Sequence, residues 1–182
     1  MDLKKLKDSE NSFESVIDRL TLEQLDTYLF RYKGKNAGIL RIFGGQVIAQ
    51  AYIAANETVS DDMQIHSLHA YFLRPGVIKQ PVLFSVDPVR DGKSFFTRTV
   101  KAIQNNEIIF TMTVSFQKEE GGITHSIEMP KVPDPDELKD EIQMREENIE
   151  LIPKELRKFF MKKREYTICL LYTSPSPRDK RL

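Results

Sequence analysis

A helix built from small side chains is the feature that most constrains the fold of this chain. It begins at Phe43-Gly44-Gly45-Gln46, runs to Glu57 and carries a wide apolar face. The residues that keep it narrow are Gly45, Ala49, Ala51, Ala54 and Ala55. Small side chains let another backbone approach closely, so a sheet can wrap around such a helix instead of touching only one side of it.

Four strand patterns follow the helix, and each is bounded by turn-forming residues. The predicted strands are Ile65–Arg74, Val82–Arg90, Ser94–Gln104 and Glu107–Gln117. The turn pairs between them are Pro75-Gly76, Asp91-Gly92 and Asn105-Asn106. This spacing predicts a meander of four antiparallel strands joined by tight turns.

The last of these strands, Glu107–Gln117, alternates most cleanly. Its apolar face is predicted to hold Ile108, Phe110, Met112, Val114 and Phe116, opposite a polar face of Thr111, Thr113, Ser115 and Gln117. A period of two with one polar face is typical of an antiparallel strand that is covered on a single side. Long antiparallel strands curve because they twist. The pattern therefore predicts an α+β fold, a curved antiparallel sheet wrapped around a central small-residue helix.

Weaker patterns flank this region. Residues 12–33 show helical spacing and then a short strand that ends at Lys33-Gly34. After Gly121-Gly122, the segment Met129–Pro135 is predicted to be an extended linker.

Two helices are predicted after the linker. The first covers Asp136–Ile152, with Leu138, Ile142 and Ile149 facing inward. Pro153 fits the first turn of the second, Lys154–Lys163, whose apolar side is Leu156, Phe159 and Phe160.

Charge and composition exclude several classes of function. The 182 residues hold 27 Lys and Arg against 27 Asp and Glu, so no net basic charge favours nucleic acid as a partner. No apolar run is long enough to predict a membrane span. The single cysteine, Cys169, excludes an internal disulfide and a multi-cysteine metal site. We expect neither a metal nor a cofactor, and an intracellular location.

The histidines are the first candidates for chemistry because only three exist. His66 and His69 lie three residues apart on one predicted strand, so we expect them on opposite faces unless a bulge shifts the alternation. For each, a hydrogen-bonded strand residue is favoured over a catalytic base. His125 is expected to be exposed in a polar loop.

The glycines at the start of the helix are the second candidate. Backbone N–H groups and the positive end of the helix dipole lie there, and glycine lets a ligand carbonyl come close, as in an oxyanion hole. Close packing of the helix start against the sheet explains Gly44 and Gly45 equally well. No phosphate-binding loop, dinucleotide motif or catalytic serine motif is present in the sequence.

Taken together, these segments resemble the type II acyl-CoA thioesterase family. The stretches that carry the resemblance are Leu29–Arg31, Phe43–Ala51, His66–Gly76, Val89–Phe95, Ala102–Asn105 and Met112–Gln117. The combination of FGGQ, HSLHAYFLRPG and RDGKSF is far more specific than any one motif.

The resemblance implies a hotdog fold and hydrolysis of fatty acyl-CoA to fatty acid and CoA. It implies residues 20–120 as the first of two hotdog domains, after an extension of residues 1–19. Residues 121–167 correspond to the connection toward a second hotdog, and residues 168–182 are expected to be a non-native tail. The catalytic Asp, Thr and Gln of the family lie in that second domain, so we expect this half to be inactive alone.

By position in the family's motifs, His66 is the first candidate for a catalytic role. Gly44, Gly45, Gln46 and His69 are the candidates for substrate binding. The expected partners are a fatty acyl-CoA and a second hotdog domain or another protomer along the sheet edge, in a peroxisome or the cytoplasm. Two alternatives remain: a complete single-hotdog thioesterase that works as a homodimer, and a non-enzymatic module that binds acyl-CoA or pairs with a partner.

Overall fold

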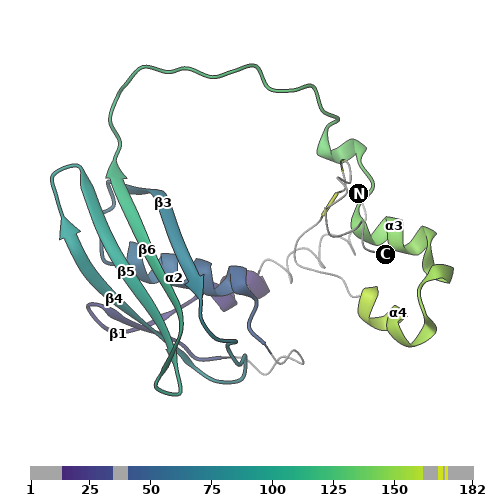
Figure 1. Ribbon diagram of the computed structural model, residues 1–182, viewed down its shortest axis with the longest axis horizontal. Helices are drawn as coiled ribbons and strands as arrows, with labels where there is room; N and C mark the ends of the chain where they lie inside the picture. Colours follow the sequence, from purple (N-terminus) through teal and green to yellow (C-terminus); the bar gives the residue numbers. More distant parts are fainter. Residues whose placement is uncertain (1–13, 35–40, 162–167, 170, 172–182) are drawn as a thin grey trace. The chain divides into compact units, whose positions relative to one another are not determined.

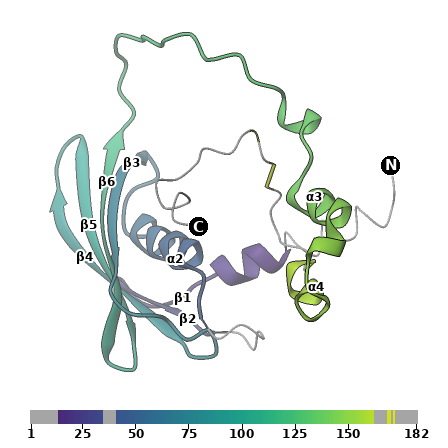
Figure 2. The same cartoon turned by 45° about the vertical axis from the view of Figure 1, so that its right-hand side comes forward.

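The computed structural model describes residues 14–34, 41–161, 168–169 and 171. The chain divides into two compact units, of which the first is Phe13–Ile123 and the second includes the chain from Thr124 onward. The first unit is a curved six-stranded antiparallel sheet that wraps around one helix, α2 (Figures 1 and 2). This is the α+β arrangement that the sequence predicts.

The elements of the first unit lie close to their predicted ranges. Helix α2 is Gly44–Asn56, and a helical segment also covers residues 14–20. The strands are β1 (Glu23–Asp26), β2 (Leu29–Tyr32), β3 (Met63–Phe72), β4 (Val82–Asp91), β5 (Phe95–Gln104) and β6 (Glu107–Lys118). Strand β1 was not predicted, because its residues show no clear alternation.

The order of the strands corrects the predicted meander. The sheet runs β1-β2-β4-β5-β6-β3, so β3 pairs with β6 at one edge and not with β4. Pro75-Gly76 therefore does not close a hairpin. It lies in a longer connection, Leu73–Pro81, that carries the chain from one edge of the sheet back to its middle.

The core lies between α2 and the inner face of the sheet. The helix contributes the small side chains of Val47, Ala51, Ala54 and Ala55 and contacts β2, β4, β5 and β6. The sheet contributes larger apolar side chains, namely Phe30, Phe84, Val86, Val100, Phe110, Met112, Val114 and Phe116. Small residues on the helix thus allow aromatic residues on the sheet to fill the space between them.

A bulge corrects the predicted alternation at the start of β6. Ala102 pairs with Phe110 but Ile103 pairs with Ile108, so the register shifts at Ile109. Ile109 is buried, whereas Ile108 is only half-buried. From Phe110 onward the predicted apolar face is correct.

The second unit breaks the predicted helix Asp136–Ile152 into three short pieces. These are η1 (Pro135–Glu137), α3 (Glu141–Glu147) and η2 (Ile149–Leu151). Asp140 starts α3 with a capping box, in which its carboxylate accepts from the Gln143 N–H and the Gln143 side chain accepts from the Asp140 N–H. A strong N-cap in the middle of the predicted helix restarts it. Leu138, Ile142 and Ile149 are half-buried.

The last described helix is α4, Lys154–Phe160, which follows Pro153 as predicted. On its predicted apolar side Leu156 and Phe160 are 47% and 36% exposed, and the side chain of Phe159 lies outside the described part. Of the predicted tail, Cys169 forms a backbone bridge with Asp140. None of the described helices is both long enough and apolar enough to cross a membrane.

Candidate functional site

The start of α2 presents bare backbone donors. Phe43 takes the N-cap position in an extended conformation, no side chain caps the helix, and the first turn holds no acid. Gln46 and Val47 both donate their N–H groups to the Phe43 carbonyl, at 3.0 and 3.3 Å. The amides of Gly44 and Gly45, as the first two of the helix, have no intrahelical acceptor. Because no described residue accepts from them, they can bind an oxygen atom of a ligand.

Two aromatic rings lie close to these glycines. A Cβ atom on Gly44 would lie 3.0 Å from the Phe72 ring, and one on Gly45 would lie 2.6 Å from the Phe43 ring. Both rings are more than half exposed. The close approach expected at this point is therefore made by two phenylalanine side chains that flank the free amides. The packing role and the ligand-binding role predicted for the glycines are compatible.

A pocket of about 370 Å³ lies beside this helix start. Its lining residues are Ile42, Gly44, Val47, Phe72, Leu73, Arg74, Pro75, Gly76, Ile109 and Phe110. The volume falls within the ~300–1,000 Å³ typical of small-molecule sites. Apart from Arg74, every lining side chain is apolar, so the pocket suits a hydrocarbon chain whose polar end meets the Gly44 amide.

One wall of the pocket is the connection after β3. Leu73 and Arg74 donate their N–H groups to the Ile109 carbonyl, at 2.9 and 3.1 Å, and the Gly76 carbonyl accepts from the Ile42 N–H at 2.9 Å. A Cβ atom on Gly76 would lie 3.1 Å from the side-chain ends of both Ile42 and Ile109. Glycine at this position therefore keeps the pocket open.

Gln46 lies on the buried side of α2, in its first turn. The side chain is 9% exposed, and its Nε2 has no hydrogen-bond partner in the described part of the chain. Gln50, one turn further on, donates through Nε2 to the Arg19 carbonyl at 2.6 Å, but its Oε1 has no partner among the same residues. Buried polar atoms are nearly always paired. Gln46 is thus a spare donor at the start of the helix.

The histidines of β3 share one face of the sheet, contrary to the expected opposite placement. The register of β3 against β6 shifts between Ile65 and Ser67, so His66 is the extra residue of a bulge. Its Nε2 lies 2.8 Å from Ser115 Oγ, and its ring meets Phe95 edge-on. His69 pairs with Thr113 and lies on the same polar face of the sheet, and its ring contacts Tyr71. Both histidines are exposed, and neither lines the pocket.

The pocket lining contains no acid, base or nucleophile that could hydrolyse a bound ester. The pKa values that are shifted belong to exposed ion pairs away from it. A hydrogen bond from Arg31 lowers the pKa of Glu23. The hydrogen bond between Lys118 and Asp62 lowers the pKa of Asp62 and raises the pKa of Lys118. Among the described residues, no group of three His, Cys, Asp or Glu side chains could hold a metal. His125 is exposed, as expected.

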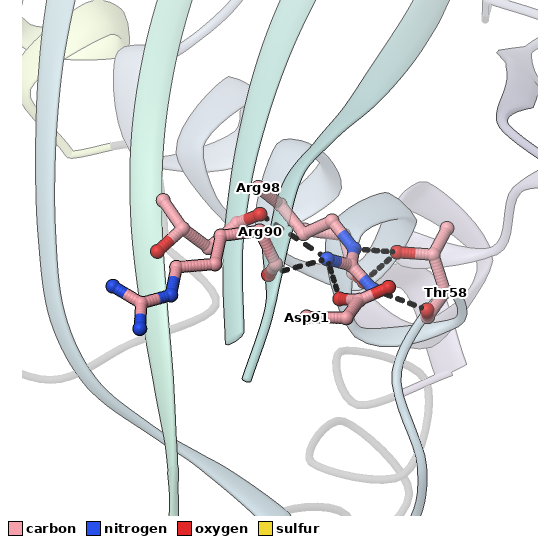
Figure 3. A network of polar contacts seen from close by, with 6 residues as sticks. Thr58, Arg90, Asp91 and Arg98 are labelled. Carbon is pink, nitrogen blue, oxygen red and sulfur yellow. Dashed lines mark hydrogen bonds and ion pairs between the residues drawn. The ribbon is translucent and has the colours of Figure 1, made fainter. Parts of the chain in front are cut away.

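A buried arginine forms the densest polar network, which sequence reasoning missed (Figure 3). Arg98 is 1% exposed and donates to Thr58 Oγ1 at 2.9 Å, to the Thr58 carbonyl at 3.0 Å and to Asp91 Oδ1 at 2.5 Å. It ties the segment after α2 to the hairpin of β4 and β5. The sequence did carry a signal for this residue. Arg98 stands between Phe96 and Val100 on the apolar face of β5, where a charged side chain is unusual.

Comparisons with known proteins agree with this architecture. Residues 34–117 match the family model described as acyl-CoA thioesterase N-terminal domain. Acyl-CoA thioesterase 2 from Haemophilus influenzae is 37% identical over 158 residues, which are 87% of this chain and 55% of that protein. The chain thus spans about half the length of this relative.

Solved structures share the fold. The crystal structure of an acyl-CoA thioesterase II from Mycobacterium marinum superposes with a TM-score of 0.60 at 42% identity, covering 66% of this chain and 45% of that one. A hotdog-fold protein from Alicyclobacillus acidocaldarius gives 0.61 at 25% identity, covering 69% and 48%. The first unit of this chain is therefore a hotdog domain, and it belongs to the acyl-CoA thioesterase family as its N-terminal domain.

Proposed function

We propose that this chain supplies the N-terminal hotdog domain of an acyl-CoA thioesterase, which hydrolyses fatty acyl-CoA to fatty acid and CoA. The observation that most supports this is the apolar pocket lined by Gly44 at the uncapped start of α2. An acyl chain fits such a pocket, and the amides of Gly44 and Gly45 can donate to the thioester carbonyl oxygen. Gln46 adds a third donor nearby.

The chemistry needs more than this domain offers. Water adds to the thioester carbonyl, negative charge gathers on its oxygen, and the CoA thiol leaves. The free amides would stabilise the charged oxygen, but the attacking water must lose a proton, and no lining residue can accept it. We therefore propose that the chain binds acyl-CoA but does not turn it over alone, the catalytic Asp, Thr and Gln being supplied by a second hotdog domain.

The free edge of β3 supports such a partner. Among the described strands β3 pairs only with β6, and its apolar side chains Leu68 and Phe72 are 43% and 56% exposed. An unpaired edge with exposed apolar side chains invites another strand. The partner we propose is a second hotdog domain or another protomer.

A homodimer of this chain is the second candidate, supported by the same edge. Sedimentation measurements of mass show whether the chain forms a dimer. A dimer that releases CoA favours the single-hotdog enzyme, whereas a dimer that binds acyl-CoA without turnover favours a non-enzymatic module. The catalytic role predicted for His66 and the binding role predicted for His69 stay predictions. His66→Ala tests the first by the release of CoA, and His69→Ala tests the second by the binding of acyl-CoA.

For the compartment, we propose the peroxisome or the cytoplasm. The former is supported by peroxisomal acyl-coenzyme A thioester hydrolase 1 of Saccharomyces cerevisiae. That protein is 32% identical over 101 residues, which are 51% of this chain and 29% of the yeast protein.

Calorimetry with a thioether analogue of a long-chain acyl-CoA tests binding, and release of free thiol from acyl-CoA tests turnover. We expect binding without turnover. Gly44→Ala should weaken binding, because the new methyl would press on Phe72 beside the amides. Gly122→Ala is the matched control, since a Cβ atom there meets nothing within 4 Å. No binding by the wild type refutes the proposal, and fast turnover refutes its dependence on a second domain.

A further inference from the structure

Gln104 is a buried side chain whose hydrogen bonds all go to one distant loop. It ends β5 and is 5% exposed. Its Oε1 accepts from the Val77 N–H at 2.8 Å, while Nε2 donates to the Val77 carbonyl at 2.9 Å and lies 3.2 and 3.4 Å from the carbonyls of Gln80 and Pro81. The amide thus pairs with Val77 as a neighbouring strand would.

This loop needs an outside support. The backbone N–H of Val77 bonds to Gln104 rather than to a strand, and the prolines at 75 and 81 have no N–H to donate. Within the loop, the Gln80 N–H reaches the Val77 carbonyl at a long 3.2 Å. Gln104 therefore holds the middle of the loop through both the N–H and the carbonyl of Val77.

A short series of contacts links Val77 to the pocket. Arg41 forms a backbone bridge with Val77, and the Ile42 N–H donates to the carbonyl of Gly76, the residue before Val77. Ile42 and Gly76 both line the pocket, and Ile42 precedes the N-cap residue of α2. The loop thus forms part of the pocket wall and lies against the segment that leads into α2.

We infer that Gln104 is a positioning residue for acyl binding, which acts through the loop and does not touch the ligand. The inference rests on the proposed function of the pocket. Because Gly76 must lie close to Ile42 and Ile109 without filling the space between them, a displaced loop changes the room for the chain more than the binding of the polar end. Loss of Gln104 should therefore penalise long acyl chains most.

The test compares the full chain with Gln104→Met, which keeps the volume and removes the hydrogen bonds. Calorimetry with thioether analogues of increasing acyl length gives the affinity gained per added carbon. Asn105→Gly is the matched control: it removes the neighbouring side-chain bond to Gln80 Oε1, at 2.8 Å, and glycine suits the positive φ of 52° there.

For the longest analogue we expect Gln104→Met to bind about tenfold more weakly, a loss of about 1.4 kcal/mol. Short analogues and Asn105→Gly should match the wild type. Hydrogen exchange at the Val77 amide should quicken in Gln104→Met alone. A merely structural role would lower stability without changing the dependence on chain length.

Two outcomes separate the inference from the function it rests on. A wild-type chain that binds no analogue overturns the proposed function, and the inference with it. A wild-type chain that binds, with Gln104→Met showing the same dependence on chain length, overturns the inference alone. If Gln104→Met does not fold, Gln104→Asn replaces it, because it keeps a neutral amide but is one methylene too short to make the same bonds to Val77.

Discussion

Replacing Arg98 by methionine tests whether its buried guanidinium holds α2 against the hairpin of β4 and β5. The side chain is 1% exposed, whereas that of its carboxylate partner, Asp91, is 51% exposed. Its other main partner is Thr58, just beyond the end of the helix, which receives two of its hydrogen bonds. We therefore expect the bonds to Thr58 and to Asp91 to contribute different amounts to the free energy of unfolding.

The bonds to Thr58 should dominate. A hydrogen bond from a charged donor contributes about 1.5–3 kcal/mol, and Thr58 is half-buried, so water replaces only part of it. We expect Arg98→Met to lower the free energy of unfolding by about 2–4 kcal/mol. Asp91→Asn should cost less than about 1 kcal/mol, because an exposed carboxylate is screened by water.

Urea unfolding followed by circular dichroism measures both changes. The transition should move to lower urea with an unchanged slope, and the loss for Arg98→Met should persist in high salt, because buried pairs are weakly screened. A loss within about 0.5 kcal/mol, the range of an ordinary surface substitution, would refute the reasoning. So would an equal loss for Asp91→Asn, since the carboxylate would then be the main partner.

Two further substitutions test local features by the same unfolding assay. Lys118→Met should lower stability in a pH-dependent way. Lys118 lowers the pKa of Asp62, so the extra stability of the wild type is lost as the pH falls below about 4. Asp62 raises the pKa of Lys118, so the same stability is also lost as the pH rises above about 10. A constant difference across pH contradicts this. Gly92→Ala should cost about 1–3 kcal/mol, because its Cβ atom would lie 2.9 Å from the Phe95 carbonyl oxygen; Gly121→Ala, with open space around it, should cost nothing.

Local sequence patterns predicted most of the helices and strands. They did not predict how strands far apart in the sequence pair with one another. The helix from Gly44 and the strands that follow it were visible as periods of 3.6 and 2. The place of β3 at the sheet edge was not, because nothing in a strand's own residues names its neighbour. The Asn105-Asn106 turn was predicted, and both residues adopt the positive φ values, 52° and 63°, that a tight hairpin needs.

Of the candidate site, the helix start was predicted and the surrounding pocket was not. Gly44, Gly45 and Gln46 could be singled out because glycines before an apolar helix expose its amides. The bulge at His66 was foreseen only as an exception, since one extra residue leaves no mark in an alternating pattern. Gln104 was predicted as the last residue of a strand, and its role was not visible because its partner, Val77, lies far back in the sequence.

The placement of β3 also fixes the order in which this sheet can form. Met63 pairs with Lys118 and Phe72 with Phe110, whereas the β4–β5 and β5–β6 pairings join strands that are neighbours in the chain. Contacts between residues far apart in sequence form slowly, because a long loop must close first. On a ribosome, β3 can therefore begin to pair only after Phe110 has emerged, and its pairing is complete only once Lys118 has followed.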